Sequence, residues 1–361
     1  MVSFVGLWKG RHVLNTNDFS QEEIELVLDS ADILRKNFRS RVPHDYLRGK
    51  TLFMLFYNRS LRTRNSFEAG IYQLGGHAHF MSPQDVYAPS LPEDMVAYQT
   101  EAISDVGRVL SRYGEAIAIR IFGDASKWVI GRGHRLIQEF ARHATVPVLN
   151  MEDDMYHPFQ ALADAQAMRQ AFPKLRGKKL VVSYAYSATL KPLAVAQSEV
   201  LIGTQMGMDV VLAYPNGFEL EDGVLEAAKA NADRYGGELS ISNSMRDAFE
   251  GANIVYPKAW LPKNFFPPHN TSVDDRGATA YQDKFKEWIC TQELMDLTNK
   301  AKYMHCGPAD RSREVTDDVI DNKDYSLYFE EAENRLHVQK AVMALVMEDR
   351  ARPQGRRRGR R

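Results

Sequence analysis

Two hydroxyl side chains and two arginines stand close together at the start of a helical pattern that follows a short apolar run. Unpaired N–H groups at a helix N-terminus favour anions, and guanidinium groups donate paired hydrogen bonds without losing their charge. The cluster therefore predicts a phosphate site, the alternative being a capped helix with solvated arginines. Its residues are Ser60, Leu61, Arg62, Thr63 and Arg64.

Two further segments place polar groups at the ends of expected elements. Arg120 closes the apolar run of residues 116–120, and open α/β sheets bind ligands at the carboxyl ends of their strands, although a lone arginine there is more often structural. His157 precedes Pro158, which favours the first position of a helix. A histidine at a positive helix end beside arginines is expected to be neutral and to donate one hydrogen bond to a carbonyl oxygen. The alternative for His157 is a satisfied histidine at a domain junction.

The pattern Ser-x-Arg-Thr-Arg of residues 60–64 resembles the carbamoyl-phosphate signature of the aspartate and ornithine transcarbamylase family. The resemblance runs from about residue 12 to about residue 348, with five motifs in the family's order. It implies that residues 60–64 bind the phosphate, that Arg120 and His157 contact the carbamoyl oxygen, and that Gln160 holds the carbamoyl NH2. The implied reaction is carbamoyl transfer from carbamoyl phosphate to a small amine, with no cofactor and no metal.

Two motifs near the C-terminus extend the resemblance. Residues 305–308, His-Cys-Gly-Pro, resemble the family's His-Cys-Leu-Pro segment, whose backbone carbonyls receive the carbamoyl amide and the attacking amine. Gly307 replaces leucine here and loosens the loop, and Cys306 alone could be an ordinary small hydrophobe. The stretch Glu-Ala-Glu-Asn-Arg-Leu-His of residues 331–337 matches a family segment in which Arg335 would be one more donor to the substrate.

The expected acceptor differs from plain ornithine. The acidic segments of the ornithine enzymes are absent, and this chain has Lys191-Pro-Leu and Lys258-Ala-Trp instead. Both departures resemble the N-acetylornithine and N-succinylornithine transcarbamylases and orphan bacterial relatives. They imply an acceptor that lacks a free α-amino group or carries an extra carboxylate, with ornithine as second choice, and they imply a knotted crossing, which is rare. The expected acceptor site comprises Glu152, Lys191, Lys258, Trp260, Cys306 and Gly307.

Two other classes of protein can be weighed against this one. A dinucleotide-dependent oxidoreductase would need a glycine-rich turn, but bulky Tyr186 and Leu190 follow the strand that ends at Tyr184. A non-catalytic carbamoyl-phosphate-binding paralogue is hinted at only by Gly307. A mere phosphate sensor would not need Arg120, His157 and Gln160 aimed at the carbamoyl group.

Composition and length limit the partners. The 46 basic and 47 acidic side chains provide no field for nucleic acid or an anionic membrane. Two cysteines fit a reducing cytoplasm, and no apolar stretch is long enough for a signal peptide or a membrane span. We expect a cytoplasmic homotrimer in which the loop of residues 82–94, with Tyr87, reaches a neighbouring active site, as the resemblance implies.

The elements that must position these residues alternate along the chain. A helix is expected at residues 18–38, followed by strands at 51–57, 77–81 and 116–121 and helical patterns at 61–74 and 95–113. A second series comprises runs 180–184, 209–214 and 253–256 with a helix at 193–206. This alternation predicts an α/β fold with two Rossmann-like αβα domains and parallel sheets. Expected domains are residues 1–155 with helix 330–348 for carbamoyl phosphate and residues 156–329 for the acceptor.

Residues 350–361 carry seven arginines and are expected to be a disordered tail, the alternative being a contact with nucleic acid or an acidic partner.

Overall fold

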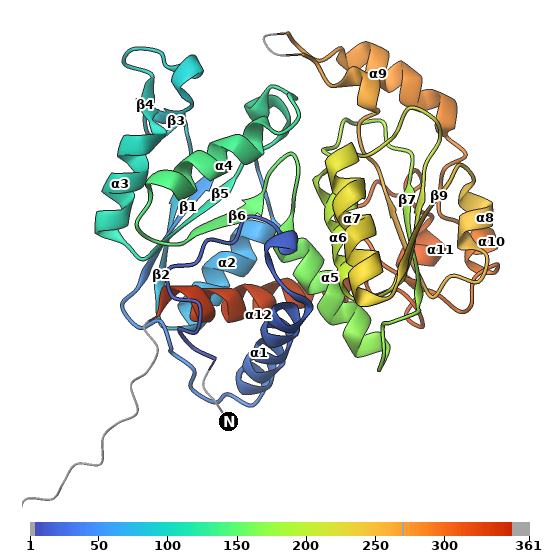
Figure 1. The fold of residues 1–361 in the computed structure, drawn as a ribbon, viewed down its shortest axis with the longest axis horizontal. Helices are drawn as coiled ribbons and strands as arrows, with labels where there is room; N and C mark the ends of the chain where they lie inside the picture. The colour runs from blue at the N-terminus through green and yellow to red at the C-terminus, as the bar shows by residue number, and fades with distance from the viewer. Residues whose placement is uncertain (1–3, 269–270, 349–361) are drawn as a thin grey trace, which may run out of the picture.

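Two parallel β-sheets form the framework of the molecule (Figure 1). The computed structural model describes residues 4–268 and 271–348, so the predicted basic tail lies outside the described residues. The first sheet consists, in spatial order, of β2 (His77–Met81), β1 (Thr51–Phe56), β5 (Ala116–Arg120) and β6 (Val148–Glu152). The second consists of β11 (Lys302–Tyr303), β10 (Ile254–Lys258), β7 (Lys179–Tyr184), β8 (Asp209–Ala213) and β9 (Glu238–Ser242). The predicted α/β fold with parallel sheets is confirmed, while the knot stays a prediction.

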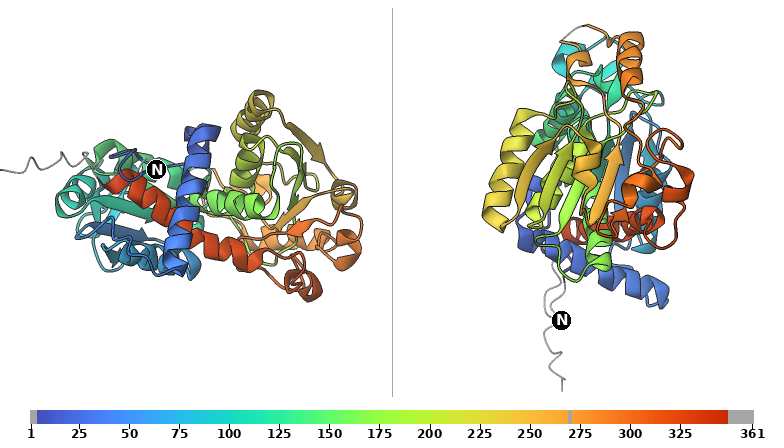
Figure 2. Two further views of the ribbon diagram at one scale, coloured as in Figure 1. Left: turned by 90° about the horizontal axis from the view of Figure 1, so that it is seen from below. Right: turned by 90° about the vertical axis from the view of Figure 1, so that its right-hand side faces the viewer.

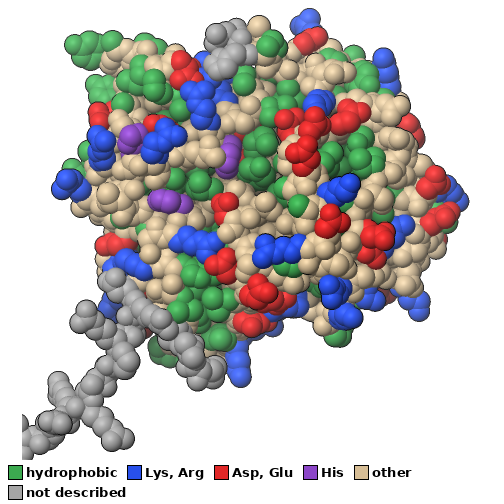
Figure 3. All heavy atoms as spheres, viewed as in Figure 1, with side chains coloured by type: hydrophobic (Ala, Val, Ile, Leu, Met, Phe, Trp, Pro, Cys, Tyr) green, Lys and Arg blue, Asp and Glu red, His purple; other side chains and the backbone are tan. Residues whose placement is uncertain are grey.

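Twelve α-helices in the described ranges cover these sheets and connect their strands. They are α1 (Gln21–Arg39), α2 (Arg62–Gln73), α3 (Ile103–Tyr113), α4 (Arg132–His143), α5 (Pro158–Ala171), α6 (Ala194–Gln205), α7 (Asp222–Tyr235), α8 (Met245–Phe249), α9 (Asp275–Gln282), α10 (Gln292–Met295), α11 (Asp317–Ile320) and α12 (Tyr328–Met347). In the described part of the chain, no helix combines the length and apolarity that crossing a membrane requires. Acidic and basic side chains are interspersed over the face shown in Figure 3, in keeping with the formal net charge of −1.

Strand β1 is buried on both faces, which explains its continuous apolar run. Successive side chains of a strand point to opposite faces of the sheet. Leu52 and Met54 therefore join the core under α2, whereas Phe53 and Leu55 join the core under α3 and α4. Such two-sided burial is typical of parallel sheets covered by crossover helices, and it fixes the position of the loop that follows β1.

Helix α1 begins where the sequence predicts. The hydroxyl of Ser20 accepts a hydrogen bond from the backbone N–H of Glu23, and the Glu23 carboxylate accepts one from the backbone N–H of Ser20. This capping box satisfies two N–H groups that the helix itself leaves unpaired. Figure 2 shows α1 crossing α12, against which it packs.

Residues 95–102 do not form the predicted first turns of a helix. They belong to a short loop in which β3 (Ala88–Ser90) pairs with β4 (Thr100–Ala102), and α3 begins only at Ile103. The hydroxyl of Thr100 accepts from the Val96 N–H at 2.7 Å, and Tyr98 has a positive φ of 59°. A side chain that bonds to nearby backbone competes with helix formation, and here it outweighs the apolar spacing.

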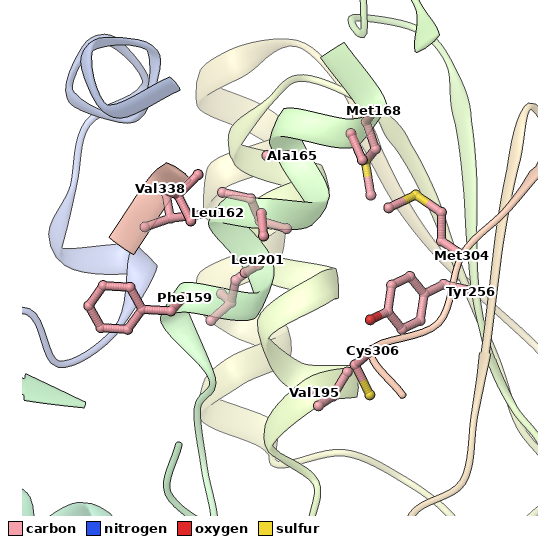
Figure 4. Close-up of a cluster of buried hydrophobic side chains, with 14 of the residues drawn as sticks. Phe159, Leu162, Ala165, Met168, Val195, Leu201, Tyr256, Met304, Cys306 and Val338 are labelled. Carbon is pink, nitrogen blue, oxygen red and sulfur yellow. The ribbon is translucent and has the colours of Figure 1, made fainter. Parts of the chain in front are cut away.

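Helix α5 lies between the two sheets and is buried along residues 158–168. In Figure 4, Phe159 and Leu162 point toward Val338 of α12, whereas Met168 points toward Met304 beside the second sheet. A helix that is buried on all sides is held by neighbours on all sides. The N-terminus of α5, with His157 and Gln160, is therefore fixed relative to both halves.

Candidate active site

A cavity of about 470 Å³ opens where the carboxyl ends of strands from both sheets face each other. Such crevices are the usual ligand sites of open α/β sheets. The start of α2, the ends of β5, β6 and β10, and the N-terminus of α5 all contribute. Lining residues are Arg59, Ser60, Leu61, Arg62, Thr63, Arg120, Phe122, Glu152, His157, Gln160, Leu190, Lys191, Pro192, Val195, Lys258, Cys306, Gly307, Pro308 and Arg335. Thirteen of the fifteen residues predicted for the site are among them.

Arg64 and Trp260 are the two that do not line the cavity. Arg64 lies on α2 two residues after Arg62, and residues spaced by two face different sides of a helix; its guanidinium stacks on Phe80 and pairs with Glu68. Trp260 is fully buried, and its indole N–H donates to the Phe218 carbonyl at 2.9 Å. The structure thus places Arg64 on the surface and Trp260 in the core of the second half, so neither position supports the predicted substrate contact.

The start of α2 forms one wall of the cavity. The hydroxyl of Ser60 accepts from the backbone N–H of Thr63 at 3.1 Å, so it satisfies one of the N–H groups that the first turn of α2 leaves unpaired. Asn58 ties this turn to the loop after β5 through two hydrogen bonds with the backbone of Phe122, at 2.9 and 3.0 Å. The two strand ends are therefore held side by side, and the cations that follow them converge.

Arginine side chains from two other elements reach the same helix start. The Thr63 hydroxyl accepts from Arg335 Nη2 at 2.7 Å and lies 3.4 Å from Arg120 Nη1. Arg120 and Arg335 are only 9% and 2% exposed, and the Nε atoms of both are buried without a hydrogen-bond partner in the described residues. Buried donors of this kind suit a ligand that brings negative charge.

Arg62 rests against a glycine. Its guanidinium donates to the Tyr328 hydroxyl at 2.5 Å and lies over that ring, 5.4 Å from the centroid. Gly307 has a φ of +62°, and a Cβ added there would collide with the Arg62 guanidinium group. Glycine at this position therefore provides both the backbone conformation and the room that Arg62 occupies. Neither Tyr328 nor this packing was predicted, because no local pattern connects residues 62, 307 and 328.

Glu152, Arg120 and His157 meet at the centre of the cavity. A carboxylate oxygen of Glu152 accepts from Arg120 Nη1 and lies 3.3 Å from His157 Nε2. Burial, then Arg335 and Arg120, hold the pKa of His157 well below its usual range. Burial raises the pKa of Glu152, an effect that Arg120 and Arg335 oppose. A neutral imidazole beside an accepting carboxylate carries its proton on the facing nitrogen, so His157 Nε2–H is the available donor.

The second half of the cavity presents lysines that are balanced by acids. Lys258 Nζ lies 3.0 Å from a Glu314 oxygen, and Lys191 Nζ lies 3.8 Å from an Asp310 oxygen. Burial would lower the pKa of Lys258, but Glu314 raises it above its usual value. Glu314 does not line the cavity, whereas both lysines do. The cavity surface at this end is therefore cationic.

Glu314 is a functional residue that sequence reasoning missed. It is fully buried, and its carboxylate also accepts from the backbone N–H groups of Ala259 and Asp310, both at 2.8 Å. Burial would raise its pKa, but Lys258 and His305 hold it well below the usual range. The available signal was Lys258 itself, since a buried ammonium at a strand end requires a carboxylate partner.

Residues 305–308 are shaped by His305. Its Nδ1 accepts from the Gly307 N–H at 2.9 Å, which leaves the proton on Nε2, 3.1 Å from Glu314. Burial raises the pKa of the Cys306 thiol to about 12. A thiol with that pKa is not a nucleophile at neutral pH. Cys306 thus contributes packing and backbone to the cavity.

The fold and cavity define an enzyme-like class: an α/β protein with a cavity between two parallel sheets that is lined by arginine, histidine and hydroxyl side chains. Comparison with known families refines this. The carbamoyl-P binding domain of aspartate/ornithine carbamoyltransferases matches residues 11–170, and their Asp/Orn binding domain matches residues 191–346. The chain therefore belongs to the aspartate/ornithine carbamoyltransferase family and is a carbamoyltransferase.

Relatives of two acceptor types are equally similar. The chain is 37% identical over 343 residues to the N-acetylornithine carbamoyltransferase of Xanthomonas campestris, covering 93% of this chain and 98% of that one. It is also 37% identical over 342 residues to the ornithine carbamoyltransferase of Thermococcus kodakarensis, covering 94% and 96%. A crystal structure of acetylornithine transcarbamylase with acetylcitrulline matches with a TM-score of 0.86 at 35% identity, covering 94% of this chain and 100% of that one. Overall identity therefore does not decide the acceptor.

Proposed function

We propose that this chain transfers the carbamoyl group of carbamoyl phosphate to the side-chain amine of an ornithine-like acceptor whose α-amine is acylated, and releases phosphate. The observation that carries the proposal is that Thr63, Arg120, His157, Gln160 and Arg335, from four separate elements, meet in one cavity. The first half of the chain, with α12, would bind carbamoyl phosphate, and the second half would bind the acceptor. The family-model matches to the two halves support this division.

The proposed chemical step needs no covalent enzyme intermediate. The acceptor amine attacks the carbamoyl carbon, the new C–N bond forms, and the C–O bond to phosphate breaks. Negative charge builds on the carbamoyl oxygen, where Arg120 and His157 Nε2–H would stabilise it. The departing phosphate accepts the proton that the amine loses. Because these groups act by position and charge, holding the two substrates together provides much of the rate gain.

Ser60, Arg62 and Thr63 would hold the phosphate. Replacing Arg62 with alanine removes a charge-assisted contact of about 1.5 to 3 kcal/mol, so the dissociation constant of carbamoyl phosphate should rise at least about tenfold. Arg64→Ala is the matched control, because Arg64 has the same chemistry two residues away but lies outside the cavity. Isothermal titration of both variants checks this. Equal weakening by the two substitutions, or none by Arg62→Ala, would remove Arg62 from the phosphate site.

The acceptor preference rests on the cationic end of the cavity. Lys258 uses one donor on Glu314, and an ammonium has three. The remaining donors favour a carbonyl or carboxylate of an acyl group over a free α-ammonium group, which Lys258 would repel. We expect higher kcat/KM for N-acetylornithine or N-succinylornithine than for ornithine in a carbamoyl-phosphate-dependent assay. A higher kcat/KM for free ornithine than for either blocked acceptor would establish the plain ornithine enzyme instead.

A homotrimer with shared active sites is part of the proposal. It is supported by large apolar side chains that are exposed near α2 and in the loop of residues 82–99 of the described chain. Tyr87 is 56% exposed, Leu61 is 74% exposed and Tyr98 is 92% exposed. Large exposed apolar groups of this kind are typical of subunit interfaces.

A further inference from the structure

Three acidic side chains lie together behind the cavity, in a place where neither the motifs nor the reaction assigns them a role. Asp164 of α5, Glu199 of α6 and Glu331 of α12 are at most 1% exposed. The carboxyl groups of Glu199 and Glu331 both lie within hydrogen-bond reach of Asp164. Within residues 4–268 and 271–348, no group of acidic, histidine or cysteine side chains is arranged to hold a metal ion.

The donors around the cluster are unequally distributed. Asp164 accepts from the Gln160 amide nitrogen at 2.9 and 3.1 Å and from the Tyr256 hydroxyl at 3.0 Å. Both Glu199 oxygens are buried and receive no hydrogen bond from the donors of the described chain. A buried carboxylate without donors is very costly. Contact between Glu199 and Asp164 is favourable only if a proton lies between them, and Glu199 is the group that carries it.

The same reasoning applies to Glu331, one oxygen of which accepts from the His305 N–H at 3.0 Å while the other has no donor in the described residues. Burial raises the pKa of all three acids, and the pKa values of Glu199 and Glu331 lie well above the usual value. For Asp164, the hydrogen bonds that its carboxylate accepts oppose this rise. Asp164 is thus the member that ionises first, and the other two donate to it.

An ionised Asp164 determines the orientation of the side-chain amide of Gln160. Gln160 lies one helical turn before Asp164, so the two side chains are neighbours. Because a carboxylate only accepts, the NH2 of Gln160 must face it, and the amide oxygen must face the other way. That oxygen accepts from Arg335 Nη1 and lies at the cavity wall. An amide turned by 180° would direct its NH2 at the Arg335 cation.

We propose that Asp164 is a positioning residue that fixes Gln160 with its carbonyl oxygen toward the carbamoyl NH2, and that neutral Glu199 holds Asp164 in place. This inference rests on the proposed function, in which the carbamoyl amide occupies that part of the cavity. Neither acid touches the substrate; both act through Gln160.

A double-mutant cycle tests the orientation. Gln160→Glu places a second acceptor against Asp164, and kcat should fall at least about tenfold, the size expected when a buried hydrogen bond is lost. In an Asp164→Asn background, the asparagine NH2 can donate to the carboxylate that Gln160→Glu introduces, whose other oxygen remains toward the cavity. The same Gln160→Glu change should then lower kcat by a factor at least about threefold smaller than it does in the wild-type background, and phosphate titration is run on every variant.

An equal loss from Gln160→Glu in both backgrounds would overturn the positioning role. The phosphate titrations show whether each variant keeps its folded anion site, so a loss through misfolding is recognised. Failure of the proposed function is a separate outcome, because the wild-type chain itself would then form no carbamoylated product.

A stability measurement tests whether Glu199 is neutral in the folded protein. The titratable groups that face it are Asp164, Glu331 and Tyr256, none of which is a cation. With a folded pKa raised above the unfolded value, Glu199 favours folding at low pH, and that contribution is lost as pH rises from about 4.5 upward. The Glu199→Gln variant has no group there to ionise and so escapes this loss. The Tm of the variant minus the Tm of wild type should therefore increase from about pH 5 to about pH 8. Glu226→Gln, at an exposed position of α7, is the matched control. A difference for Glu199→Gln that stays constant or falls would show that Glu199 is ionised in the folded protein.

Discussion

Replacing His157 with alanine should lower kcat by about 100- to 1000-fold, the usual cost of removing one preorganised oxyanion donor. His157 is the N-cap residue of the buried helix α5, and its neutral Nε2–H faces the centre of the cavity rather than the start of α2, where we propose that the phosphate binds. The donors at that helix start remain in place in the variant. Phosphate affinity should therefore stay within about threefold of wild type.

Steady-state kinetics together with direct phosphate titration separate the two effects. His143→Ala is a suitable control, because His143 ends α4, pairs with Glu139 and does not line the cavity. Near-normal turnover of His157→Ala, or a loss of phosphate binding in a folded variant, would show that His157 does not act on the carbonyl end of the substrate.

Replacing Glu314 with alanine should lower the free energy of unfolding by about 3 to 5 kcal/mol, because removing one partner of a buried ion pair leaves the other charge uncompensated. Lys258 has a side chain only 8% exposed and would lose its partner at 3.0 Å, and two backbone N–H groups would lose their acceptor. Since the pKa of Glu314 lies well below the usual range, its contribution is present above about pH 4.5 and is lost as pH falls through the folded pKa.

Urea titration at neutral pH measures this loss. The double variant Lys258→Met with Glu314→Leu is the matched control, since replacing both charges by apolar groups avoids the unpaired cation. The double variant should be more stable than Glu314→Ala. A Glu314→Ala protein within about 1 kcal/mol of wild type would show that water already solvates Lys258.

The sequence predicted the parts of the site that depend on local pattern. Arg62 and Thr63 follow a buried strand and begin a helix, Arg120 ends a strand, and His157 precedes Pro158, so each position could be derived from its neighbours along the chain. Long-range partners could not be derived in this way. Tyr328 meets Arg62 across 266 residues, and Glu314 meets Lys258 across 56.

Two errors show where local patterns fail. Arg64 shares a motif with Arg62, but the rotation of the helix carries it to the surface. Residues 95–102 have apolar spacing that favours a helix, yet a side-chain hydrogen bond to Thr100 and the pairing of β3 with β4 hold them in a loop. The direction of Arg64 follows from its two-residue spacing from Arg62 once the helix start is known. The pairing of Ala88 with Thr100 joins separate segments, and residue spacing does not encode it.

Carbamoyl transfer itself is tested most directly with carbamoyl phosphate that carries ¹³C in its carbonyl group. The wild-type chain is incubated with the label and N-acetylornithine, N-succinylornithine or ornithine, and the products are followed by ¹³C and ³¹P NMR. We predict that the label appears in a ureido group on the acceptor, with one phosphate released for each ureido group formed, and that His157→Ala slows both signals together. Phosphate release without a labelled ureido group on any of these acceptors would contradict the proposed function.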